Sequence, residues 1–530
     1  MTVRPLGVRK PVMSETQHIR KIAIVGGGTA GWSAACLLGR IFARDDTEIT
    51  LIESSAIPTV GVGEATIPPI FEFLQLLEID PVDFVRETQS TFKLAIEFRD
   101  WLKVGHSYWH PFGNFGLTID RRPFHHYWWK NQAEGHDESV ADFCPSIALA
   151  EKNKFLFPPA DGQFPGGALS YALHFDAGLV AKYLRQVSEG LGVTRLDRKV
   201  QSATLNDRGH IGELLCDDGS RVAADLYIDC SGFHGLLIEQ SLNAGYQDWT
   251  NWLPCDRAVA VQSEAVLPRT PYTISTAREA GWQWRIPLQN RVGNGYVYSS
   301  AFISDADAQD RLVRSLDGKA LADPRVIGFT AGHRKKFWDG NCVSIGLSAG
   351  FLEPLESTSI HLIVTGLNRL LDYFPDRNFD PSLQAAYNRE TLTEYEHIRD
   401  FLLLHYYPNQ RVGEPFWDQV RHAPLPDSLA TKMEMFRKNG RIISRRRELF
   451  HDLSWFFVAR GMGITPENYD PLVDIPDFAD VRDVMGQVGD AVGRLADAAP
   501  THDQFLDALI TPGNHRRPAF HAPSISGFGR

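Results

Sequence analysis

The stretch KIAIVGGGTAG, residues 21–31, decides the fold class of this chain. Five residues, Lys21 to Val25, form a short β-prone run with an apolar centre that leads directly into the GxGxxG pattern of residues 26–31. The residues that follow, 32–43, predict a helix, and residues 48–52 predict a second strand that ends at Glu53. A strand, a glycine-rich turn, a helix and a second strand form a βαβ unit that binds a dinucleotide.

Each element of this unit has a physical role. Gly26 permits the tight turn, Gly28 lets the backbone approach a pyrophosphate, and Gly31 lets the helix pack closely on the strand. Thr29 and Ala30 belong to the turn that opens the helix, where free N–H groups and a positive partial charge favour phosphate. Glu53 would accept hydrogen bonds from the adenosine ribose. An ordinary glycine-rich turn is the alternative, and it leaves the position of Glu53 unexplained.

Two later segments favour FAD over NAD as the nucleotide. Residues 225–232 resemble the late strand and turn of the glutathione-reductase-type FAD fold, with Asp229 at the end of the strand. Residues 341–350 resemble the strand and loop beside the flavin, with Gly346 followed by Leu347 where many hydroxylases have aspartate. The chain carries no second GxGxxG before a helix, and we interpret Gly293-Asn294-Gly295 as a hairpin turn. The sequence therefore predicts no NAD(P)H site of its own.

Composition and charge exclude several classes of protein. The chain has 530 residues, 43% hydrophobic and 22% charged, with a formal net charge of −11, which is typical of a globular protein and not of a general nucleic-acid binder. Arg445-Arg446-Arg447 is too short a basic run to indicate a membrane surface, and no apolar run is long enough to span a bilayer. The six cysteines form no CxxC pair, so we expect free thiols, no metal site and a cytoplasmic location.

The predicted fold is α/β (α+β): a glutathione-reductase-type FAD-binding fold plus a mainly helical C-terminal substrate module. We expect a flexible tail over residues 1–19, a discontinuous FAD-binding domain with substrate-facing insertions over 20–395, a helical module over 396–512, and a second flexible tail over 513–530. Within the helical module, residues 399–407 and 436–463 predict helices, and residues 414–417 predict a loop that leads into another.

A strand with two tryptophans connects this fold to a known family. In Gly281-Trp282-Gln283-Trp284-Arg285-Ile286-Pro287, alternate residues of a strand would place Trp282, Trp284 and Ile286 on one side. On its own this pattern also fits a core strand. Together with the other motifs, the chain resembles the tryptophan-halogenase type of flavin-dependent halogenases over about residues 21–424. The motifs that carry the resemblance are GxGxxG at 26–31, GEAT at 63–66, TFK at 91–93, HPFG at 110–113, WxWxIP at 282–287 and FLEPLEST at 351–358.

The resemblance implies a reaction and its participants. Reduced FAD, dioxygen and a halide, chloride or bromide, give hypohalous acid, which travels through a tunnel to a separate pocket and halogenates an electron-rich arene. It also implies a separate NAD(P)H-dependent flavin reductase as partner. We expect a monomer or homodimer, with no nucleic-acid or membrane partner. Two alternatives stay open: a flavin-dependent aromatic monooxygenase on the same scaffold, and a non-catalytic FAD-binding protein.

The resemblance assigns Lys93 and Glu356 to catalysis. The Lys93 ammonium would donate a hydrogen bond to hypohalous acid, or its amine would form a haloamine, and burial beside aromatics would lower its pKa. The alternative is a surface lysine of a helix, paired with Glu97. Glu356 would stabilise the ring cation and accept its proton; it also precedes an apolar helix predicted over 357–370 and fits an acidic helix start.

Other assignments surround this pair. The backbone N–H groups of Thr358 and Ser359 would bind halide; glycine is usual at Ser359, where a positive φ would strain serine. Gly63, Glu64, Ala65 and Thr66 resemble the strap between the flavin and substrate sites, although Thr66 also fits a helix cap. His125 and His126 are expected on opposite faces of a strand, which disfavours a metal pair.

Aromatic residues would hold the substrate. His110, Pro111 and Phe112 match the positions that stack on indole in tryptophan enzymes, with core packing as the alternative, and Trp455 lies in the C-terminal region that would face the substrate. No tyrosine pair follows it to grip an amino acid; Tyr406-Tyr407 lies earlier. We therefore expect an indole-like arene, not free tryptophan.

Overall fold

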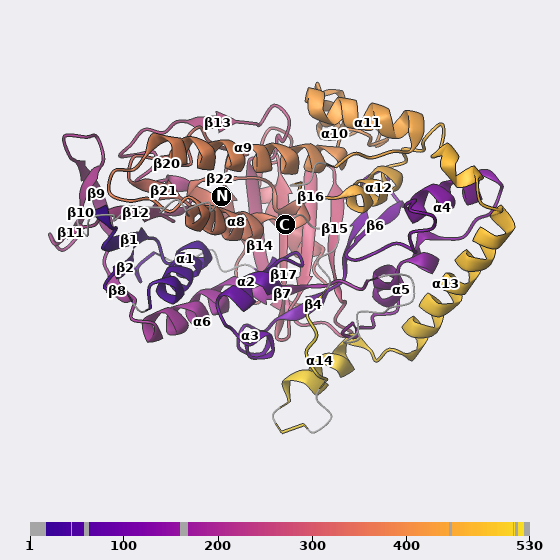
Figure 1. The fold of residues 1–530 in the computed structure, drawn as a ribbon, viewed down its shortest axis with the longest axis horizontal. Coiled ribbons are helices and arrows are strands. Elements are labelled where there is room, and N and C mark those ends of the chain that lie inside the picture. Colours follow the sequence, from indigo (N-terminus) through magenta and orange to yellow (C-terminus); the bar gives the residue numbers. More distant parts are fainter. Residues whose placement is uncertain are drawn as a thin grey trace, which may run out of the picture.

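The computed structural model describes residues 17–43, 45–57, 63–158, 168–444, 448–511, 513–514 and 518–523. It is a mixed α/β fold in which two large sheets lie side by side, with helices on their outer faces and at one end (Figure 1). The largest hydrophobic core extends through the chain from Ile19 to Leu509, so the early and late segments pack into one body. The predicted tail of residues 1–19 and the run Arg445-Arg446-Arg447 fall mostly or wholly outside the described residues.

The first sheet contains the predicted βαβ unit. Its order is β20-β21-β12-β1-β2-β8, and all neighbours are parallel except the β20–β21 pair. Its strands are β20 (Trp338–Asp339), β21 (Cys342–Ser344), β12 (Leu226–Asp229), β1 (Lys21–Val25), β2 (Glu48–Glu53) and β8 (Thr194–Asp197). Both segments predicted to lie late in the FAD fold, β12 and β21, extend the sheet beside β1, which confirms the predicted fold class.

Helices cover this sheet. α1 follows the glycine-rich turn directly and packs on β1 and β2. The helices on this side of the fold are α1 (Thr29–Ile41), α6 (Ala177–Gly190) and α8 (Ser359–Asp372), the last two packed on α1, and α9 (Pro381–Leu404), which contacts β20. α9 is a single helix of 24 residues that crosses the boundary expected between residues 395 and 396. That boundary therefore does not coincide with a break between elements.

The second sheet has seven strands in the order β18-β14-β17-β16-β15-β5-β6. They are β18 (Arg325–Gly328), β14 (Arg257–Glu264), β17 (Arg291–Tyr298), β16 (Gly281–Pro287), β15 (Tyr272–Arg278), β5 (Ala95–Arg99) and β6 (Ser107–Pro111), with α7 (Asp305–Arg314) packed on β14 and β17. The WxWxIP segment is β16, as predicted.

The hairpin turn predicted at residues 293–295 is wrong, because these residues lie inside β17. A Cβ at Gly293 would lie 3.0 Å from Gly63 Cα, and one at Gly295 would lie 2.0 Å from the Trp284 ring. These two glycines make room for a neighbouring strand and a tryptophan, and they do not form a turn.

Three small sheets and the remaining helices complete the fold. The small sheets are β3 (Gly63–Ala65), β7 (Ala172–Asp176) and β4 (Thr91–Lys93); β9 (Val200–Leu205), β10 (Ile211–Cys216) and β11 (Arg221–Ala223); and β13 (Tyr246–Asp248), β19 (Gly332–Arg334) and β22 (Gly350–Phe351). The helices are α2 (Ile70–Leu76), α3 (Pro81–Glu87), α4 (Phe124–Ala133), α5 (Pro145–Glu151), α10 (Pro415–His422), α11 (Asp427–Asn439), α12 (Asp452–Gly461), α13 (Phe478–Ala498) and α14 (His502–Ile510). Within the residues that the structure describes, none of these helices combines the length and apolar character needed to cross a bilayer.

Two predictions in the helical regions are wrong. The helix expected over 436–463 is two helices, because α11 ends at Gly440, whose φ is +61°, and α12 begins at Asp452. His125 and His126 lie on helix α4 and not on a strand, since the aromatic run around them forms a buried helix face. In the described part of the chain no group of three or more His, Cys, Asp or Glu side chains is placed to hold a metal ion.

The C-terminal helices complete the end of the second sheet. α12 packs on the edge strand β6, and α13 packs on α5. The described part of the C-terminal tail has no regular structure and folds back on the core: Phe520 contacts Phe71 and Phe157, and the His521 carbonyl accepts a hydrogen bond from Tyr171.

Candidate active site

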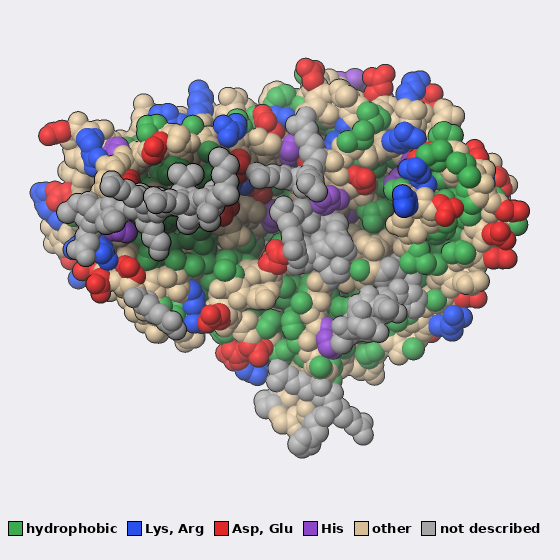
Figure 2. Space-filling model, in the orientation of Figure 1, with side chains coloured by type: hydrophobic (Ala, Val, Ile, Leu, Met, Phe, Trp, Pro, Cys, Tyr) green, Lys and Arg blue, Asp and Glu red, His purple; other side chains and the backbone are tan. Residues whose placement is uncertain are grey.

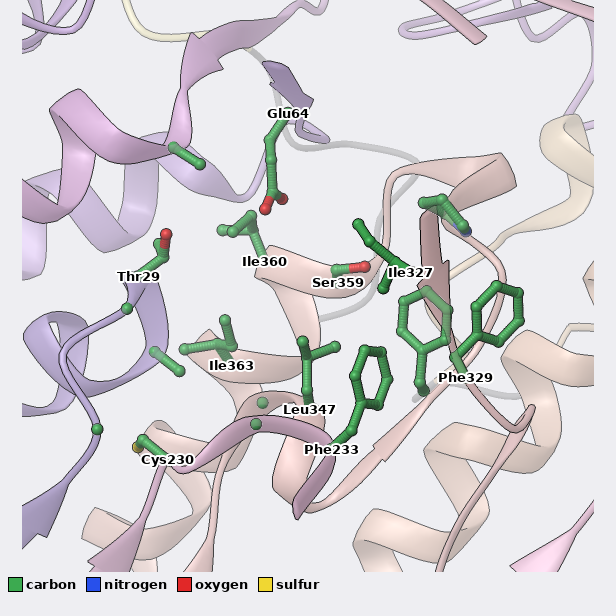
Figure 3. A pocket seen from close by; sticks show the side chains of 18 of the residues that line it. Thr29, Glu64, Cys230, Phe233, Ile327, Phe329, Leu347, Ser359, Ile360 and Ile363 are labelled. Atoms are coloured by element: carbon green, nitrogen blue, oxygen red, sulfur yellow. The ribbon is translucent and has the colours of Figure 1, made fainter. Parts of the chain in front are cut away.

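A large cavity lies between the two sheets and opens on the face drawn in Figure 2, where hydrophobic side chains gather in a hollow. Its volume is about 860 Å³, within the range of roughly 300–1,000 Å³ that is usual for sites of small molecules and cofactors. Figure 3 shows side chains that line it from α1, from the second sheet and from α8, including Thr29, Ile327 and Ile363. Gly26, Gly28, Ala30 and Glu53 line the same cavity, as the predicted nucleotide site requires.

The structure shows why glycine is needed at two of the three motif positions. Gly26 has a φ of +113°, and a Cβ there would lie 2.2 Å from the Cys230 carbonyl oxygen. A Cβ at Gly31 would lie 1.8 Å from the Gly26 oxygen, so only glycine permits this packing of helix on strand. A Cβ at Gly28 would meet nothing within 4 Å, which leaves its backbone open to the cavity. A phosphate can therefore approach the backbone at Gly28.

Glu53 ends β2 beside this turn. Its Oε1 pairs with Arg195 Nε at 2.7 Å, which orients the carboxylate over the turn. A Cβ at Gly27 would lie 1.3 Å from Glu53 Oε2, so the middle glycine of the motif is also required. Sequence analysis missed this requirement, since residue 27 is a free position of the GxGxxG pattern.

Asp229 and Gly346 occupy different positions relative to the cavity. Gly346 lines it, with a φ of +74° that favours glycine. Asp229 is buried and does not line it; its carboxylate accepts hydrogen bonds from Ser231, Leu237 and Ile238. Cys230, Ser231 and Gly232 line the cavity in its place. The structure thus places Asp229 as the residue that fixes this turn, one position from the wall.

The GEAT segment joins the cavity to Lys93. Gly63, Glu64 and Ala65 form β3 and line the cavity, and the Glu64 side chain points into it (Figure 3). Burial raises the pKa of Glu64 to about 7. Thr66 follows on the other side, where its hydroxyl donates to the Leu173 carbonyl and its own carbonyl accepts from Lys93. Thr66 does not cap a helix, because α2 begins only at Ile70.

Trp282, Trp284 and Ile286 all line the cavity from β16, as the strand pattern predicts. The indole N–H of Trp282 donates to Glu353 Oε2 at 2.8 Å, and Tyr406 donates to the same oxygen. Glu353 is completely buried, and burial raises its pKa. This contact ties the WxWxIP strand to the FLEPLEST segment, residues 351–358.

Lys93 lies just behind the cavity wall. It is in strand β4 and completely buried, which contradicts the alternative of a helix-surface lysine; Glu97 pairs with Arg99. Its Nζ donates to the Thr66 carbonyl at 3.0 Å and to Ser357 Oγ at 2.8 Å, and it lies 5.0 Å from the Phe112 ring centroid. Burial lowers the pKa of Lys93 to about 7, although the charge of Glu356 opposes that shift.

Glu356 is also completely buried, at the end of the 3-10 turn Pro354–Glu356. Its Oε2 lies 2.8 Å from His110 Nδ1, and its Oε1 lies 2.9 Å from His405 Nε2. Burial alone would raise the pKa of Glu356, but the two histidines outweigh burial and lower it to about 2. The carboxylate is therefore held ionised inside the protein.

The turn after Glu356 lies between the cavity and the buried Lys93 side chain. Ser357 lines the cavity and accepts the Lys93 hydrogen bond, and its φ of +59° is left-handed. The expected helix begins later, at Ser359, and the positive φ falls at Ser357, so the strain expected at Ser359 does not arise. Ser359 lines the cavity; Thr358 is its buried N-terminal neighbour. The first N–H groups of a helix have no partner within it, so those at this turn can bind an anion.

Aromatic rings surround His110. The ring of His110 lies 5.4 Å from Phe401, 6.0 Å from Phe450 and 6.5 Å from Phe112, while Pro111 ends β6 between them. Trp455 lies one layer behind: its ring contacts Phe401, and its N–H donates to the Phe450 carbonyl. The structure thus brings Phe401 and Phe450 next to His110, two residues that sequence analysis did not single out because neither belongs to a motif.

Comparisons with known proteins agree with this geometry. The family model described as Tryptophan halogenase matches residues 21–477. The chain belongs to the tryptophan halogenase family. Tryptophan 7-halogenase RebH from Lentzea aerocolonigenes is 34% identical to this halogenase over 532 residues, with 92% of this chain and 98% of that protein covered.

Solved structures show the same relationship. BrvH, a flavin-dependent halogenase from Brevundimonas sp. BAL3, superposes with a TM-score of 0.89 at 43% identity and covers 93% of this chain and 100% of its own. Xcc4156, a flavin-dependent halogenase from Xanthomonas campestris, gives a TM-score of 0.89 at 42% identity and covers 96% and 100%. This halogenase is therefore an enzyme with the FAD-binding fold of its family.

Proposed function

We propose that this halogenase uses reduced FAD and dioxygen to oxidise bromide or chloride, and that it halogenates a small indole-like arene at a site formed by Lys93 and Glu356. The observation that carries the proposal is the position of Ser357, which lines the cavity on one side and accepts a hydrogen bond from buried Lys93 on the other. Ser357 therefore joins the cavity in which the oxidant would be made to the lysine that would receive it.

The cavity fits FAD on chemical grounds. Gly28 leaves its backbone open to a pyrophosphate, Glu53 lies where ribose hydroxyls would bind, and Trp282 and Trp284 offer an apolar wall to a flat ring. Reduced FAD, when bound, supplies the two electrons with which dioxygen converts halide to hypohalous acid and water. The free N–H groups at Thr358 and Ser359 are the proposed halide site.

Lys93 would hold the oxidised halogen. Two of its hydrogens are used on Thr66 and Ser357, which leaves the third N–H of the ammonium, or the lone pair of the amine, for the oxidant. Because its pKa is about 7, both forms are available near neutral pH. Glu356 would then accept the proton that the ring loses, since it is buried and ionised. His110 and Phe112 would orient the ring by aromatic contacts.

The substrate proposal rests on the groups that surround His110. The neighbours of His110 are phenylalanine rings, which suit a flat arene. The nearby ammonium of Lys432 lies over the Trp455 ring and already pairs with Glu448 at 2.5 Å, so it is not free to bind a substrate carboxylate. These contacts support indole or a simple substituted indole over free tryptophan.

A competition assay tests the substrate. Equal indole and tryptophan are incubated with the enzyme, FAD, NADH, a flavin reductase and bromide, and products are identified by mass spectrometry and NMR. We expect brominated indole, with substitution at the pyrrole carbon beta to nitrogen, where the ring itself is most reactive. Parallel assays with chloride give the halide preference, and an assay without halide tests for hydroxylation. Benzo-ring bromination of tryptophan as the main product would contradict the proposal.

The electron supply is tested separately. The sequence contains one dinucleotide motif, residues 26–31, and its first five residues line the cavity, so we expect a separate NAD(P)H-dependent reductase. NADH alone should leave bound FAD oxidised over minutes, as its absorbance near 450 nm would report. Addition of a flavin reductase should start turnover; rapid bleaching without it would refute this part.

A further inference from the structure

The Glu356 carboxylate is part of a buried series of close polar contacts that extends beyond the halogenase motifs. Tyr108 Oη lies 2.7 Å from His405 Nδ1, His405 Nε2 lies 2.9 Å from Glu356 Oε1, and Glu356 Oε2 lies 2.8 Å from His110 Nδ1. His405, Glu356 and His110 are completely buried, and Tyr108 is 4% exposed. Tyr108 and His110 are alternate residues of β6, so they share one face of that strand.

We propose that His405, held by Tyr108, is a positioning residue that orients Glu356 and keeps it ionised for the halogenation step. The inference rests on the catalytic role proposed for Glu356. His405 touches Glu356 on the side opposite His110, so it acts through the carboxylate and not on the arene.

The direction of each hydrogen bond follows from the chemistry of the groups. The lone pairs of an ionised carboxylate would repel a ring-nitrogen lone pair at 2.9 Å, so His405 must carry its proton on Nε2. Neutral His405 then has a lone pair on Nδ1, which must accept from the Tyr108 hydroxyl. Burial, with the charge of Glu356, raises the pKa of Tyr108 well above its usual value, so the hydroxyl keeps its proton. Burial lowers the pKa of His405, although Glu356 opposes that shift, which favours the neutral ring.

Packing fixes the position of the His405 ring. It stacks on Phe98 at 4.5 Å, and Phe98 in turn stacks on Tyr108 at 4.9 Å from the neighbouring strand β5. The backbone of His405 forms the C-terminal cap of α9. The ring therefore cannot turn away from Glu356 without disturbing the aromatic cluster, and Tyr108 selects its tautomer.

The charged and titratable groups that face Glu356 are Lys93, Tyr108, His110 and His405. Loss of the His405 donor would leave one oxygen of a buried carboxylate without its partner. Burial then dominates, and the pKa of Glu356 rises. The rate of arene halogenation would acquire an acidic limb that the wild-type enzyme lacks above pH 5, because protonated Glu356 cannot accept the ring proton.

The test measures how the oxidised halogen divides between indole and a halogen-trapping dye in single turnovers of reduced, FAD-loaded enzyme between pH 5 and pH 8. For His405→Phe we expect the limb to shift upward by roughly 5 pH units, the upper end of the scale for a fully buried carboxylate, which would lower the yield of haloindole about 100-fold at pH 5. His405→Gln, whose amide N–H can take the place of Nε2–H, should recover most of the yield. Tyr108→Phe should lose about tenfold, since the wrong tautomer becomes accessible.

Controls separate positioning from folding. His125→Phe replaces another buried histidine stacked on a phenylalanine, 5.2 Å from Phe456, and should leave the yield and its pH profile unchanged. FAD affinity, measured by fluorescence quenching, should be equal in all variants. If His405→Phe does not fold, Tyr108→Phe carries the test.

The outcomes distinguish this inference from the proposed function. If Glu356→Gln halogenates indole like wild type, the site assignment itself is wrong. If Glu356→Gln loses activity but His405→Phe keeps a wild-type yield and flat profile, only the role of His405 is wrong. Equal losses in His405→Phe and His405→Gln without a pH shift would also overturn it. In the Glu356→Gln background, His405→Phe should cause no further loss.

Discussion

The FAD-side cavity and the buried Lys93 site are constructed in different ways. The nucleotide end of the cavity owes its shape to backbone and glycine: Gly26 and Gly31 let the turn and α1 pack closely, and Gly28 leaves its backbone open to the cavity. The Lys93 site is made of side chains, and its partners come from β4, β6, the turn at Glu356 and the end of α9. A site made by one local turn tolerates few changes of backbone, whereas a site assembled from distant elements depends on the chemistry of single side chains.

The largest expected effect comes from removing the Lys93 side chain, the centre of the site made of side chains. Lys93→Ala should lower haloindole formation to below about one-thousandth of wild type, because the oxidant is then neither held nor directed. FAD affinity and oxygen consumption should be nearly unchanged, and a trapping dye should collect the escaping hypohalous acid. Lys130→Ala is the matched control, since Lys130 is a buried lysine over a phenylalanine ring, 4.4 Å from Phe478. Wild-type bromination by Lys93→Ala would mean that the site is elsewhere.

The second prediction concerns the carboxylate. Glu356→Gln should lower the halogenation rate by about 100-fold, the usual scale for a lost proton acceptor, with FAD binding intact. Glu394→Gln provides the comparison, because Glu394 is also held by a histidine, with its Oε1 3.1 Å from His361, but lies on α9 away from Lys93. Rapid-quench product analysis measures both. A loss of the same size in both variants would show that the effect is structural.

The third prediction tests the backbone side through two glycines of one motif. Gly31→Ala should lower the free energy of unfolding by about 1–3 kcal/mol, because its Cβ would overlap the Gly26 oxygen. Gly28→Ala should leave stability within about 0.5 kcal/mol but weaken FAD binding about tenfold, since its Cβ enters the space for phosphate. Denaturation curves without FAD and flavin titration separate the two effects. Equal effects on both quantities would contradict this division.

The smallest expected effect is on stability, and it measures the free-energy cost of burying the charged form of Lys93. The pKa of Lys93 is lowered to about 7 in the folded state, so the unfolded chain binds more protons between pH 7 and the usual lysine pKa. The penalty for burying the charge is therefore complete below pH 7 and disappears as the pH rises toward 10. Lys93→Met should be more stable than wild type by about 1 kcal/mol at pH 6, with a smaller difference at pH 9. Urea denaturation at both pH values measures this, and a difference that grows with pH would contradict it.

The sequence predicted the cavity better than the Lys93 site for a physical reason. Local sequence patterns predict the βαβ unit, the strand β16 and the two strands near Asp229 and Gly346. The structure has a strand in each of these segments. The same local reasoning failed at residues 293–295, where Gly293 makes room for a strand 230 positions earlier in the chain, at Gly63.

The partners of Glu356 could not be predicted from local sequence patterns. His405 and Phe450 have no motif around them, and the packing of α12 on β6 and on α9 brings them to Glu356 and His110. Ser357 was recognised only as the start of a helix, because its left-handed backbone is imposed by the turn and not by its residue type. Contacts that join distant segments leave no periodic signal in a single sequence.

The continuous helix α9 limits how this enzyme can be recombined with its relatives. Asn388, near its start, accepts hydrogen bonds from the backbone of Phe337 and Trp338 in the FAD sheet, and His405 caps its far end beside Glu356. At 1.5 Å per residue, its 24 residues span roughly 36 Å. A chimaera joined at residue 395 would splice two helices in mid-turn, and a shift of one residue would rotate the imidazole by about 100° away from the carboxylate. Exchanged C-terminal modules should therefore begin before Pro381, so that α9 is inherited whole.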